Sequence, residues 1–452
     1  MKRIQPLLIG LILIEAIYAF DTMVLAIAMP SVANDLDGQA WYSIGFGVFI
    51  LASLVGVVWS GSSVDSRGAH YALLRGFACF SLGLIVAALA ENFFVFIVAR
   101  GIQGLGGGVL TTAANALINA AYDREQRPRI IALLNTAWMV PALLAPGVGG
   151  FLVEGIGWRY IFWLQLPILL VIGYFFLPLV RQYKPSSSSQ VNFSLTPTLQ
   201  LVFASALILL LLNQAEVSPL LLLLPLAFML LFKALQRLLP PGTLSAHYGL
   251  AASLCGLALT TFVFYLSEIF IPLLLTEAYQ LSATSAGFAL TMAAVTWPIG
   301  GALQAWLIQR YSYRFCVSAG SIAMIGGLFL LLLQAWLGWS HLWIYLAWGY
   351  MGACLGQLKA AGRACAMEFT QPGQEGSTAS AKGVLDALAG GLAAGVAGMI
   401  YNIGQQQQWS LTGSVSLVWL VALSVAFLLL PLAWSRYPKG QRRAVSMLTA
   451  EG

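Results

Sequence analysis

Charged residues are scarce in this sequence. Only 8% of its 452 residues are Asp, Glu, Lys or Arg, and 60% are hydrophobic, whereas soluble domains carry about 25% charged residues. The scarcity excludes a soluble fold, because a chain of this length could not bury so much apolar surface. The composition predicts an all-α membrane protein with many spans. Its net charge of +6 then reports the orientation of loops rather than a contact with nucleic acid.

Several motifs of enzymes and ATP-driven pumps are also missing. The chain has no GxxxxGK[ST] stretch for a nucleotide, no HExxH or His-rich cluster for a metal, and no HxxxxD-like pair for acyl transfer. These absences favour a secondary transporter over an enzyme, with no cofactor and a proton gradient as the energy source. The cysteines form no CxxC pair and are interpreted as packing residues: Cys79, Cys255, Cys316, Cys354 and Cys365.

Long apolar runs recur along the whole chain. A helix needs about 20 apolar residues to cross about 30 Å of hydrocarbon, and fourteen runs approach or exceed that length. With the N-terminus in the cytoplasm, 20 of the 22 Lys and Arg residues fall in inner segments, and only Arg100 and Arg159 fall elsewhere. Both termini are therefore predicted to be cytoplasmic. The predicted spans are 7–29, 41–62, 71–90, 93–118, 129–153, 159–180, 197–214, 218–238, 248–271, 283–308, 315–337, 342–363, 377–402 and 411–434.

An internal repeat divides the chain into similar halves. RGIQGLGGG at 100–108 and WGYMGACLG at 348–356 share three glycine positions at a constant offset of 248. Two related bundles with two inserted spans suit a transporter whose site lies between the bundles, although glycines also recur at any tight helix crossing. The polar stretch RQYKPSSSSQ marks a linker at 181–190. The predicted units are a six-helix bundle at 1–180, the linker with two inserted spans at 181–240, a second six-helix bundle at 241–436 and a cytoplasmic tail at 437–452.

Five stretches carry a family resemblance. They are FDTMVLAIAMP at 20–30, GSSVDSRG at 61–68, ARGIQGLGGG at 99–108, VPALLAPGVGG at 140–150 and WRYIFWLQLPI at 158–168. Together they resemble the major facilitator superfamily, and within it the fourteen-span drug:proton antiporter group. The chain departs from the family pattern at Ser66, Ala69 and His70 in the second stretch, and at Val140 and Ala145 in the fourth.

The resemblance implies gating roles for the second and fourth stretches. The loop glycines permit a tight turn, and Asp65 would latch onto the start of the thirteenth span near Ser377 and close the inner gate. Prolines in the fifth span allow bending, and its paired glycines allow a close neighbour. Packing alone is the alternative interpretation. The gating residues are Gly61, Asp65, Arg67, Gly68, Pro141, Pro146, Gly149 and Gly150.

Two opposite charges within the apolar spans share one depth. Asp21 lies about 21 Å from the inner edge and Arg100 about 10 Å from the outer edge, at 1.5 Å per residue. Because the resemblance places the first and fourth spans together beside a central cavity, we expect Asp21 and Arg100 to interact, directly or through water, within a water-accessible vestibule. A static ion pair that only holds the two helices is the alternative.

Other polar residues in the spans complete the predicted site. Glu268 lies late in the ninth span, and Asp386 follows Lys382 by four residues, a spacing that favours a local ion pair. For Asp386 and Glu15 a structural and a functional role both stay open. The predicted proton-coupling residues are Asp21, Arg100, Glu268 and Asp386. The predicted cavity residues are Glu15, Tyr18, Gln103, Trp138, Phe264 and Trp297.

These features predict proton-coupled efflux of drugs or toxic compounds by alternating access. An outside proton would neutralise an acid such as Asp21 or Glu268 and release the substrate. Counting Glu15, Asp21 and Glu268 against Arg100 favours a lipophilic cation, with neutral compounds as the second choice. An exporter of one metabolite, a proton-coupled importer and a non-transporting receptor are the alternatives. The expected partners are a small molecule, protons and the lipid bilayer, for a monomer in a bacterial cytoplasmic membrane.

Overall fold

In the computed structural model, residues 4–122, 139–183, 195–213, 222–371 and 375–439 are described, together with positions 126, 130, 133, 134 and 137. Within these residues the regular structure is helical, with fourteen helices of fifteen or more residues. They are α1 (Ile4–Asp35), α2 (Tyr42–Arg67), α3 (Ala69–Ala88), α4 (Phe93–Ala121), α6 (Met139–Gly155), α7 (Arg159–Val180), α8 (Leu195–Leu212), α9 (Leu224–Leu238), α10 (Leu250–Glu268), α12 (Ala283–Leu307), α13 (Tyr313–Leu337), α14 (Leu342–Phe369), α15 (Glu375–Gln406) and α16 (Leu411–Phe427). Short helices α11 (Ile271–Leu273) and α17 (Leu429–Arg436) and the π-helical turn η3 (Leu274–Ala278) extend two of them.

Each predicted apolar run overlaps one of these long helices, although parts of the runs 129–153 and 218–238 lie outside the described residues. Ten helices are long and apolar enough to cross a membrane, and two further apolar helices, Met139–Gly155 and Thr196–Leu212, are shorter. The helical architecture is therefore confirmed. The crossing of all fourteen helices and the cytoplasmic position of both termini stay predictions.

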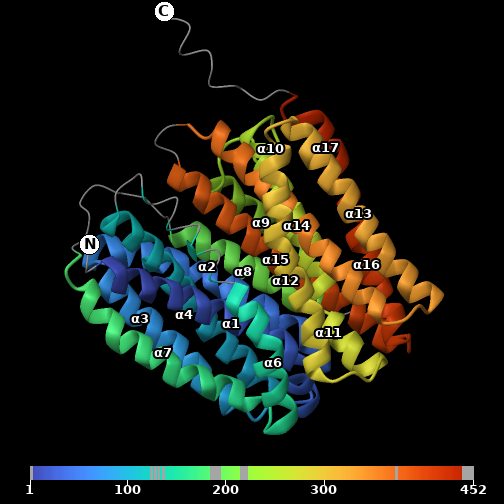
Figure 1. The fold of residues 1–452 in the computed structure, drawn as a ribbon, viewed down its shortest axis with the longest axis horizontal. Coiled ribbons are helices and arrows are strands. Elements are labelled where there is room, and N and C mark those ends of the chain that lie inside the picture. Colours follow the sequence, from blue (N-terminus) through green and yellow to red (C-terminus); the bar gives the residue numbers. More distant parts are fainter. Residues whose placement is uncertain are drawn as a thin grey trace, which may run out of the picture.

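The helices form two groups that lie side by side (Figure 1). Helices α1 to α7 make up the first group and α10 to α17 the second. Helices α8 and α9 pack against each other, and α8 also contacts α2 and α15. Leu201 and Leu231 from these inserted helices share a buried apolar cluster with Leu54 of α2 and Leu388 of α15. The inserted pair thus covers the line where the two groups meet.

The internal repeat is present in the packing. In α4, a Cβ added at Gly108 would lie 2.0 Å from the carbonyl oxygen of Ser53 on α2. In α14, a Cβ added at Gly356 would lie 2.0 Å from the carbonyl oxygen of Trp297 on α12. Backbones approach this closely only where a side chain is missing. The α2–α4 crossing of the first group therefore recurs as the α12–α14 crossing of the second.

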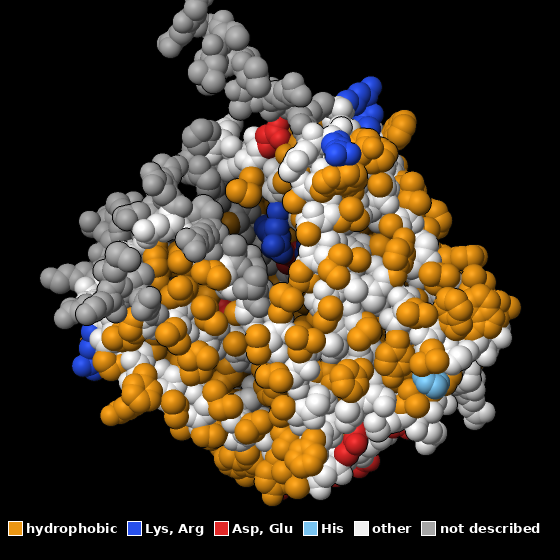
Figure 2. All heavy atoms as spheres, viewed as in Figure 1, with side chains coloured by type: hydrophobic (Ala, Val, Ile, Leu, Met, Phe, Trp, Pro, Cys, Tyr) orange, Lys and Arg blue, Asp and Glu red, His pale blue; other side chains and the backbone are white. Residues whose placement is uncertain are grey.

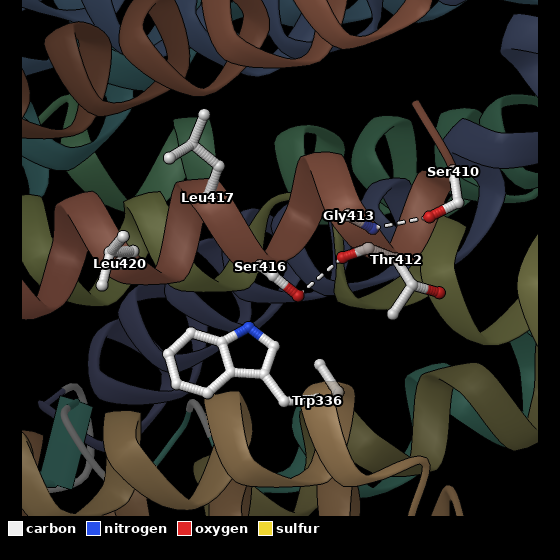
Figure 3. A pocket seen from close by; sticks show the side chains of 8 residues that line it. Trp336, Ser410, Thr412, Gly413, Ser416, Leu417 and Leu420 are labelled. Atoms are coloured by element: carbon white, nitrogen blue, oxygen red, sulfur yellow. Dashed lines mark hydrogen bonds between the residues drawn. The ribbon is translucent and has the colours of Figure 1, made fainter. Parts of the chain in front are cut away.

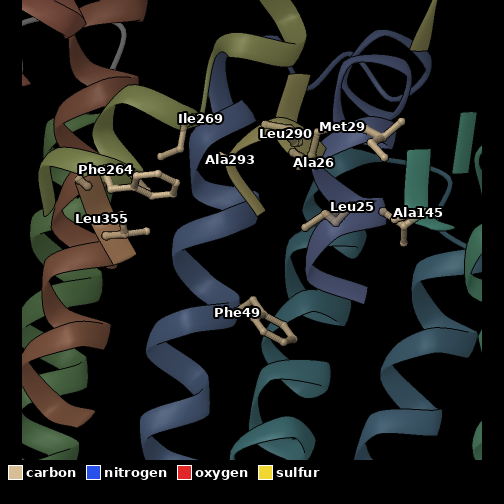
Figure 4. Packing of buried hydrophobic residues seen from close by; sticks show 14 of the residues in the cluster. Leu25, Ala26, Met29, Phe49, Ala145, Phe264, Ile269, Leu290, Ala293 and Leu355 are labelled. Atoms are coloured by element: carbon tan, nitrogen blue, oxygen red, sulfur yellow. The ribbon is translucent and has the colours of Figure 1, made fainter. Parts of the chain in front are cut away.

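The two groups contact each other strongly toward one end. The hydroxyl of Thr291 on α12 donates to the carbonyl oxygen of Ala142 on α6, at 2.8 Å. At the end of α1, the Asn34 side chain donates to Glu277 at 2.9 Å. Apolar side chains fill the space between these contacts (Figure 4), where Leu25 and Met29 of α1 lie near Leu290 of α12. This end of the molecule is closed.

A hollow separates the two groups elsewhere. Figure 2 shows it between the halves, with basic and acidic side chains within it. The two groups meet along α2 and α15, where Gly47 packs on Ala394 and Gly391 on Leu51. Closer to the start of α15, open space replaces this contact, since a Cβ at Gly383 would meet nothing within 4 Å. The hollow therefore reaches α15 near Gly383.

Candidate functional site

Asp21, Arg100 and Gln103 form a closed hydrogen-bonded triangle between α1 and α4. The Arg100 guanidinium donates to Asp21 Oδ2 at 3.0 Å and to Gln103 Oε1 at 2.5 Å. The Gln103 amide donates to Asp21 Oδ1 at 2.7 Å. Gln103 follows Arg100 by three residues, which places both side chains on one face of α4. The predicted contact between Asp21 and Arg100 is thus present and direct.

Aromatic rings complete the surroundings of the triangle. The Arg100 guanidinium lies 4.2 Å from the ring centre of Phe49 on α2, a cation–π contact. Tyr18, one turn before Asp21 on α1, packs on the same Phe49 ring at 5.7 Å. Glu15 lies within electrostatic range of Tyr18. The predicted cavity residues Gln103, Tyr18 and Glu15 therefore lie in sequence away from the buried pair of Asp21 and Arg100: Gln103 bonds to it, Tyr18 lies within its electrostatic range, and Glu15 lies near Tyr18.

The expectation of a water-accessible vestibule at this pair is wrong for the conformation seen here. Asp21 and Gln103 are 0% exposed, and Arg100 is 1% exposed. Both carboxylate oxygens accept hydrogen bonds from protein groups, and Phe49 covers the guanidinium. The sequence predicts depth along a helix but not which neighbours close over a side chain.

Glu268 lies at the end of α10 and is partly buried. Among the described residues it has no hydrogen-bond or ion-pair partner. Tyr265, one turn earlier, lies within electrostatic range of both Glu268 and Asp386. Phe264 is 6% exposed and stacks on Trp348 of α14 with ring centres 4.6 Å apart. Phe264 therefore forms part of a packed wall in this conformation.

A second charged cluster joins α10, α14 and α15. Asp386 Oδ1 accepts from Lys359 at 2.6 Å and from the Thr261 hydroxyl at 2.6 Å, and Lys359 also contacts Thr261. Asp386 Oδ2 accepts from Lys382 at 2.6 Å. The i, i+4 pair of Lys382 and Asp386 is confirmed. The sequence reasoning missed Lys359, which it counted as a loop cation, although its position within an apolar helical run was a visible signal.

The predicted gating residues fall in two places. On α6, Gly150 packs on Thr284 of α12, and Gly149 packs on Val24 of α1. Pro146 lies within α6, and its Cα faces Gly287 of α12. Pro141 is buried on the same helix. The close approach expected at the paired glycines is confirmed: Gly149 approaches a helix of its own group, and Gly150 approaches a helix of the other group.

The loop motif between α2 and α3 is only partly described. Gly68 has φ of +87°, a backbone conformation that glycine adopts at little cost, and it separates the two helices. Trp138 lies outside the described residues. The side chains of Asp65, Arg67 and Ser377 and the surroundings of Gly61 are not described either. The predicted latch between Asp65 and the start of the thirteenth span therefore stays a prediction.

Two shallow depressions lie away from these clusters. One, of about 480 Å³, lies between α13 and α16, with Trp336 facing Ser416 (Figure 3). Its hydrogen bonds are local to α16, from the Gly413 amide to Ser410 Oγ and from Ser416 Oγ to the Thr412 carbonyl. The other, of about 560 Å³, lies beside Asp35 and Arg159. Trp297 lines neither and is 36% exposed.

A buried acid–Arg pair inside the first of two helix bundles, together with packing that repeats in both bundles, suits a membrane transporter. The model of the Major Facilitator Superfamily matches residues 11–267, more than half of the chain. The chain belongs to this superfamily. It is an integral multi-pass membrane protein of a family of transporters, not of enzymes.

Relatives of this facilitator include pumps from bacteria and fungi. It is 26% identical over 303 residues to the multidrug efflux pump SdrM of Staphylococcus aureus, covering 64% of this chain and 66% of SdrM. It is 26% identical over 344 residues to multidrug resistance protein 3 of Bacillus subtilis, covering 72% of this chain and 65% of that one. A match of 31% over 174 residues to the transporter ppz2 of Metarhizium majus covers 37% of this chain and only 30% of ppz2.

Solved structures share the fold of this facilitator. A bacterial homologue of the lysosomal transporter Spinster, inward-facing and unoccupied, has a TM-score of 0.69 at 14% identity, with 95% of each chain covered. The xylose transporter XylE of E. coli, in a partially occluded inward-open conformation, has a TM-score of 0.66 at 14% identity, covering 98% of this chain and all of XylE. At this identity the likeness concerns the fold alone.

Proposed function

We propose that this facilitator exports small amphipathic drugs or toxic compounds in exchange for protons. The buried triangle of Asp21, Arg100 and Gln103 is the observation that carries the proposal. A carboxylate in the apolar part of a membrane protein is costly and is retained mostly for function. The pumps SdrM and multidrug resistance protein 3 support efflux as the direction of transport.

Competition between a proton and other partners of the acids would couple the two fluxes. Asp21 is held in this conformation by Arg100 and Gln103. When the helices α1 and α4 move apart in the opposite-facing conformation, water reaches the carboxylate and a proton takes the place of the guanidinium. Glu268, which has no described partner, is a second acid for the same exchange. Neutralising Glu268, which has no described cation beside it, lowers the cost of returning the empty site through the apolar phase.

The contacts between α6 and α12 suit a gate that opens as the two bundles rock. Gly150 brings the two helices close, and three hydrogen bonds join them, from the Thr291 hydroxyl to the Ala142 carbonyl and from the amide and hydroxyl of Thr284 to Glu154. Separating the two helices breaks these three hydrogen bonds, two of which are exposed at the surface. The loop residues Asp65 and Arg67 would close the opposite end, as the resemblance implies.

The remaining predictions about the whole protein belong to the same proposal. They comprise fourteen spans with both termini in the cytoplasm, the bundle boundaries at 180 and 240, a monomer, and a bacterial cytoplasmic membrane. The sequence favours lipophilic cations or neutral compounds as substrates. That preference comes from a charge count that left out Lys359 and Lys382, both of which lie within the helices.

A dedicated exporter of one metabolite is the second candidate function. The dehydrocurvularin exporter of Alternaria cinerariae is 31% identical to this chain over 168 residues, covering 36% of this chain and 28% of the exporter. A panel of structurally unrelated toxic compounds separates the two functions. Protection of expressing cells against several classes favours a multidrug pump, and protection against one favours a dedicated exporter.

The test of proton coupling uses two Asp→Asn variants of α1. Proteoliposomes holding Asp21→Asn should lose most of the efflux driven by an imposed pH gradient. Asp35→Asn is the matched control, because Asp35 lies on the same helix and also pairs with an arginine, Arg159, but that pair is 38–50% exposed. Asp35→Asn should keep wild-type efflux. Equal efflux by Asp21→Asn and wild type would remove Asp21 from the coupling mechanism.

A further inference from the structure

The charged cluster on α14 and α15 carries more positive than negative charge. Lys382 and Arg363 each lie within electrostatic range of Lys359, and Asp386 is the acid that pairs with the two lysines. Arg363 is exposed one turn after Lys359 on α14 and has no ion pair with a described residue. Two cations therefore share the Asp386 carboxylate, and a third lies near Lys359 without such a described partner.

Several hydrogen-bond donors of this cluster have no acceptor among the described side chains. Three donors already occupy Asp386, with Lys359 and Thr261 on Oδ1 and Lys382 on Oδ2. An ammonium group has three donors, and Lys382 uses one of them on Asp386. The free donors of Lys382 and the guanidinium of Arg363 have no acceptor among the described side chains. An incoming acidic group would supply the missing acceptors.

Open space lies beside these donors. Lys382 and Asp386 are 28% and 22% exposed, whereas Lys359 is 7% exposed. Gly383, between them on α15, is exposed, and a Cβ placed there would meet nothing within 4 Å. The α2–α15 contact begins further along, where Gly390 packs on Ile50. The cluster thus borders the open space beside Gly383, before the two bundles meet along α2 and α15.

The positive-inside rule alone does not account for the cluster. That rule concerns cations in loops and at helix ends, which stay in water. Lys359 instead lies within α14, is nearly buried and is fixed by contacts with Thr261 on α10 and Asp386 on α15. Burying an ammonium group this way is costly unless it is paired. Two further cations beside it raise that cost, so a structural role would be better served by one lysine.

We propose that this cluster binds an acidic group of the transported compound, a carboxylate or a sulfonate. The substrates would then be amphipathic anions or zwitterions rather than simple lipophilic cations. The apolar part of the molecule would contact the neighbouring walls of the hollow, which include Ile50 and Tyr265 beside Gly390. Ammonium groups with free donors are suited to an acidic group at such a site. The inference rests on the proposed export function but concerns only which compounds bind.

Tetramethylrhodamine and its methyl ester test the inference. Both dyes share one amphipathic ring system, and they differ only by the free carboxylate. Binding to the purified full-length protein in detergent is measured by fluorescence anisotropy, without a proton gradient. The wild type should bind the acid about tenfold more tightly than the ester, since a hydrogen bond to a charged group contributes on that order. The variant Lys382→Met should lose this preference and keep its affinity for the ester.

Two controls separate the possible outcomes. Lys233→Met makes the same change on the exposed face of α9, outside the cluster, and should behave as the wild type. Unchanged ester binding by Lys382→Met shows that the variant is folded. Equal affinities for the two dyes, equal losses of both in Lys382→Met, or no binding of the acid would each overturn the inference. Stabilisation of the wild type but not Lys382→Met by phosphatidylglycerol, with equal dye affinities, would assign the cluster to lipid instead. A failure of proton coupling alone would leave these binding results intact.

Discussion

The close crossing of α2 and α4 makes a prediction about two glycines of one motif. Gly104 follows Gln103 in RGIQGLGGG, and a Cβ there would lie 2.3 Å from the carbonyl oxygen of Phe49. Gly101 lies one turn earlier, and its Cβ would meet only the Val48 side chain at 3.4 Å, an ordinary contact. The change to alanine is chemically identical at both positions, but only Gly104 touches a backbone that cannot rotate away.

The sizes of two opposing effects decide whether alanine stabilises or destabilises the protein at each position. Replacing a helical glycine by alanine gains up to about 1 kcal/mol of helix propensity. Overpacking a close contact costs about 1–3 kcal/mol. Gly104→Ala is therefore expected to lower the free energy of unfolding by up to about 2 kcal/mol. Gly101→Ala should leave it unchanged or raise it. Because Phe49 supports the Arg100 guanidinium, the shift of α2 should also weaken transport in Gly104→Ala.

The assay is thermal unfolding of each purified variant in detergent, followed by tryptophan fluorescence. The second bundle offers an independent pair, because a Cβ at Gly352 would lie 2.3 Å from the carbonyl oxygen of Ala293, and one at Gly349 would lie 3.3 Å from Met292 Cβ. Gly352→Ala should unfold at a lower temperature than Gly349→Ala. If the tight and the loose positions gave equal unfolding temperatures in both bundles, the packing reasoning would be refuted.

Two further predictions concern the buried acids. Asp21→Leu and Arg100→Met each leave one buried partner unpaired, and each should lower the free energy of unfolding by about 3–5 kcal/mol. The double variant should lose less than the sum of the two single losses, by about 1–3 kcal/mol. Denaturant unfolding in detergent measures these losses, and additive losses would contradict a tight pair. Glu268→Gln should change the free energy of unfolding by less than about 0.5 kcal/mol and should reduce pH-driven efflux in proteoliposomes.

The positions of the long helices and of the first charged pair could be predicted from the sequence, because both depend on distance along a helix. The length of apolar runs places the helices, and the rise per residue places Asp21 and Arg100 at one depth. The glycine offset of 248 correctly anticipated the repeated crossing of α2 with α4 and of α12 with α14.

The rest of the site depends on contacts between distant helices, which carry no local signal. Lys359 is brought to Asp386 because α14 and α15 both pack against α10. Counting it with the loop cations satisfied the positive-inside rule and hid this role. The sealing of Asp21 likewise depends on contacts that no local pattern predicts, with Gln103 on the carboxylate and Phe49 over the Arg100 guanidinium.

The two bundles differ in the partner of their equivalent acids. This difference explains why Glu268→Gln should reduce proton-driven efflux without changing the free energy of unfolding. Tyr18 and Asp21 on α1 recur as Tyr265 and Glu268 on α10, at a constant offset of 247. The backbone packing repeats, but the charge does not. The position equivalent to Arg100 on α14 is Trp348, whose ring stacks on Phe264 instead of pairing with an acid.

Removing Asp21 therefore strands a buried cation, whereas removing the charge of Glu268 strands none among the described residues. A loss of transport in Asp21 variants alone would be ambiguous, since it could follow from the stranded Arg100. A loss in Glu268→Gln at unchanged stability has no such explanation and would point to the proton itself. Wild-type efflux by Glu268→Gln, measured at several imposed pH gradients, would exclude Glu268 from the coupling and leave Asp21 as the acid to test.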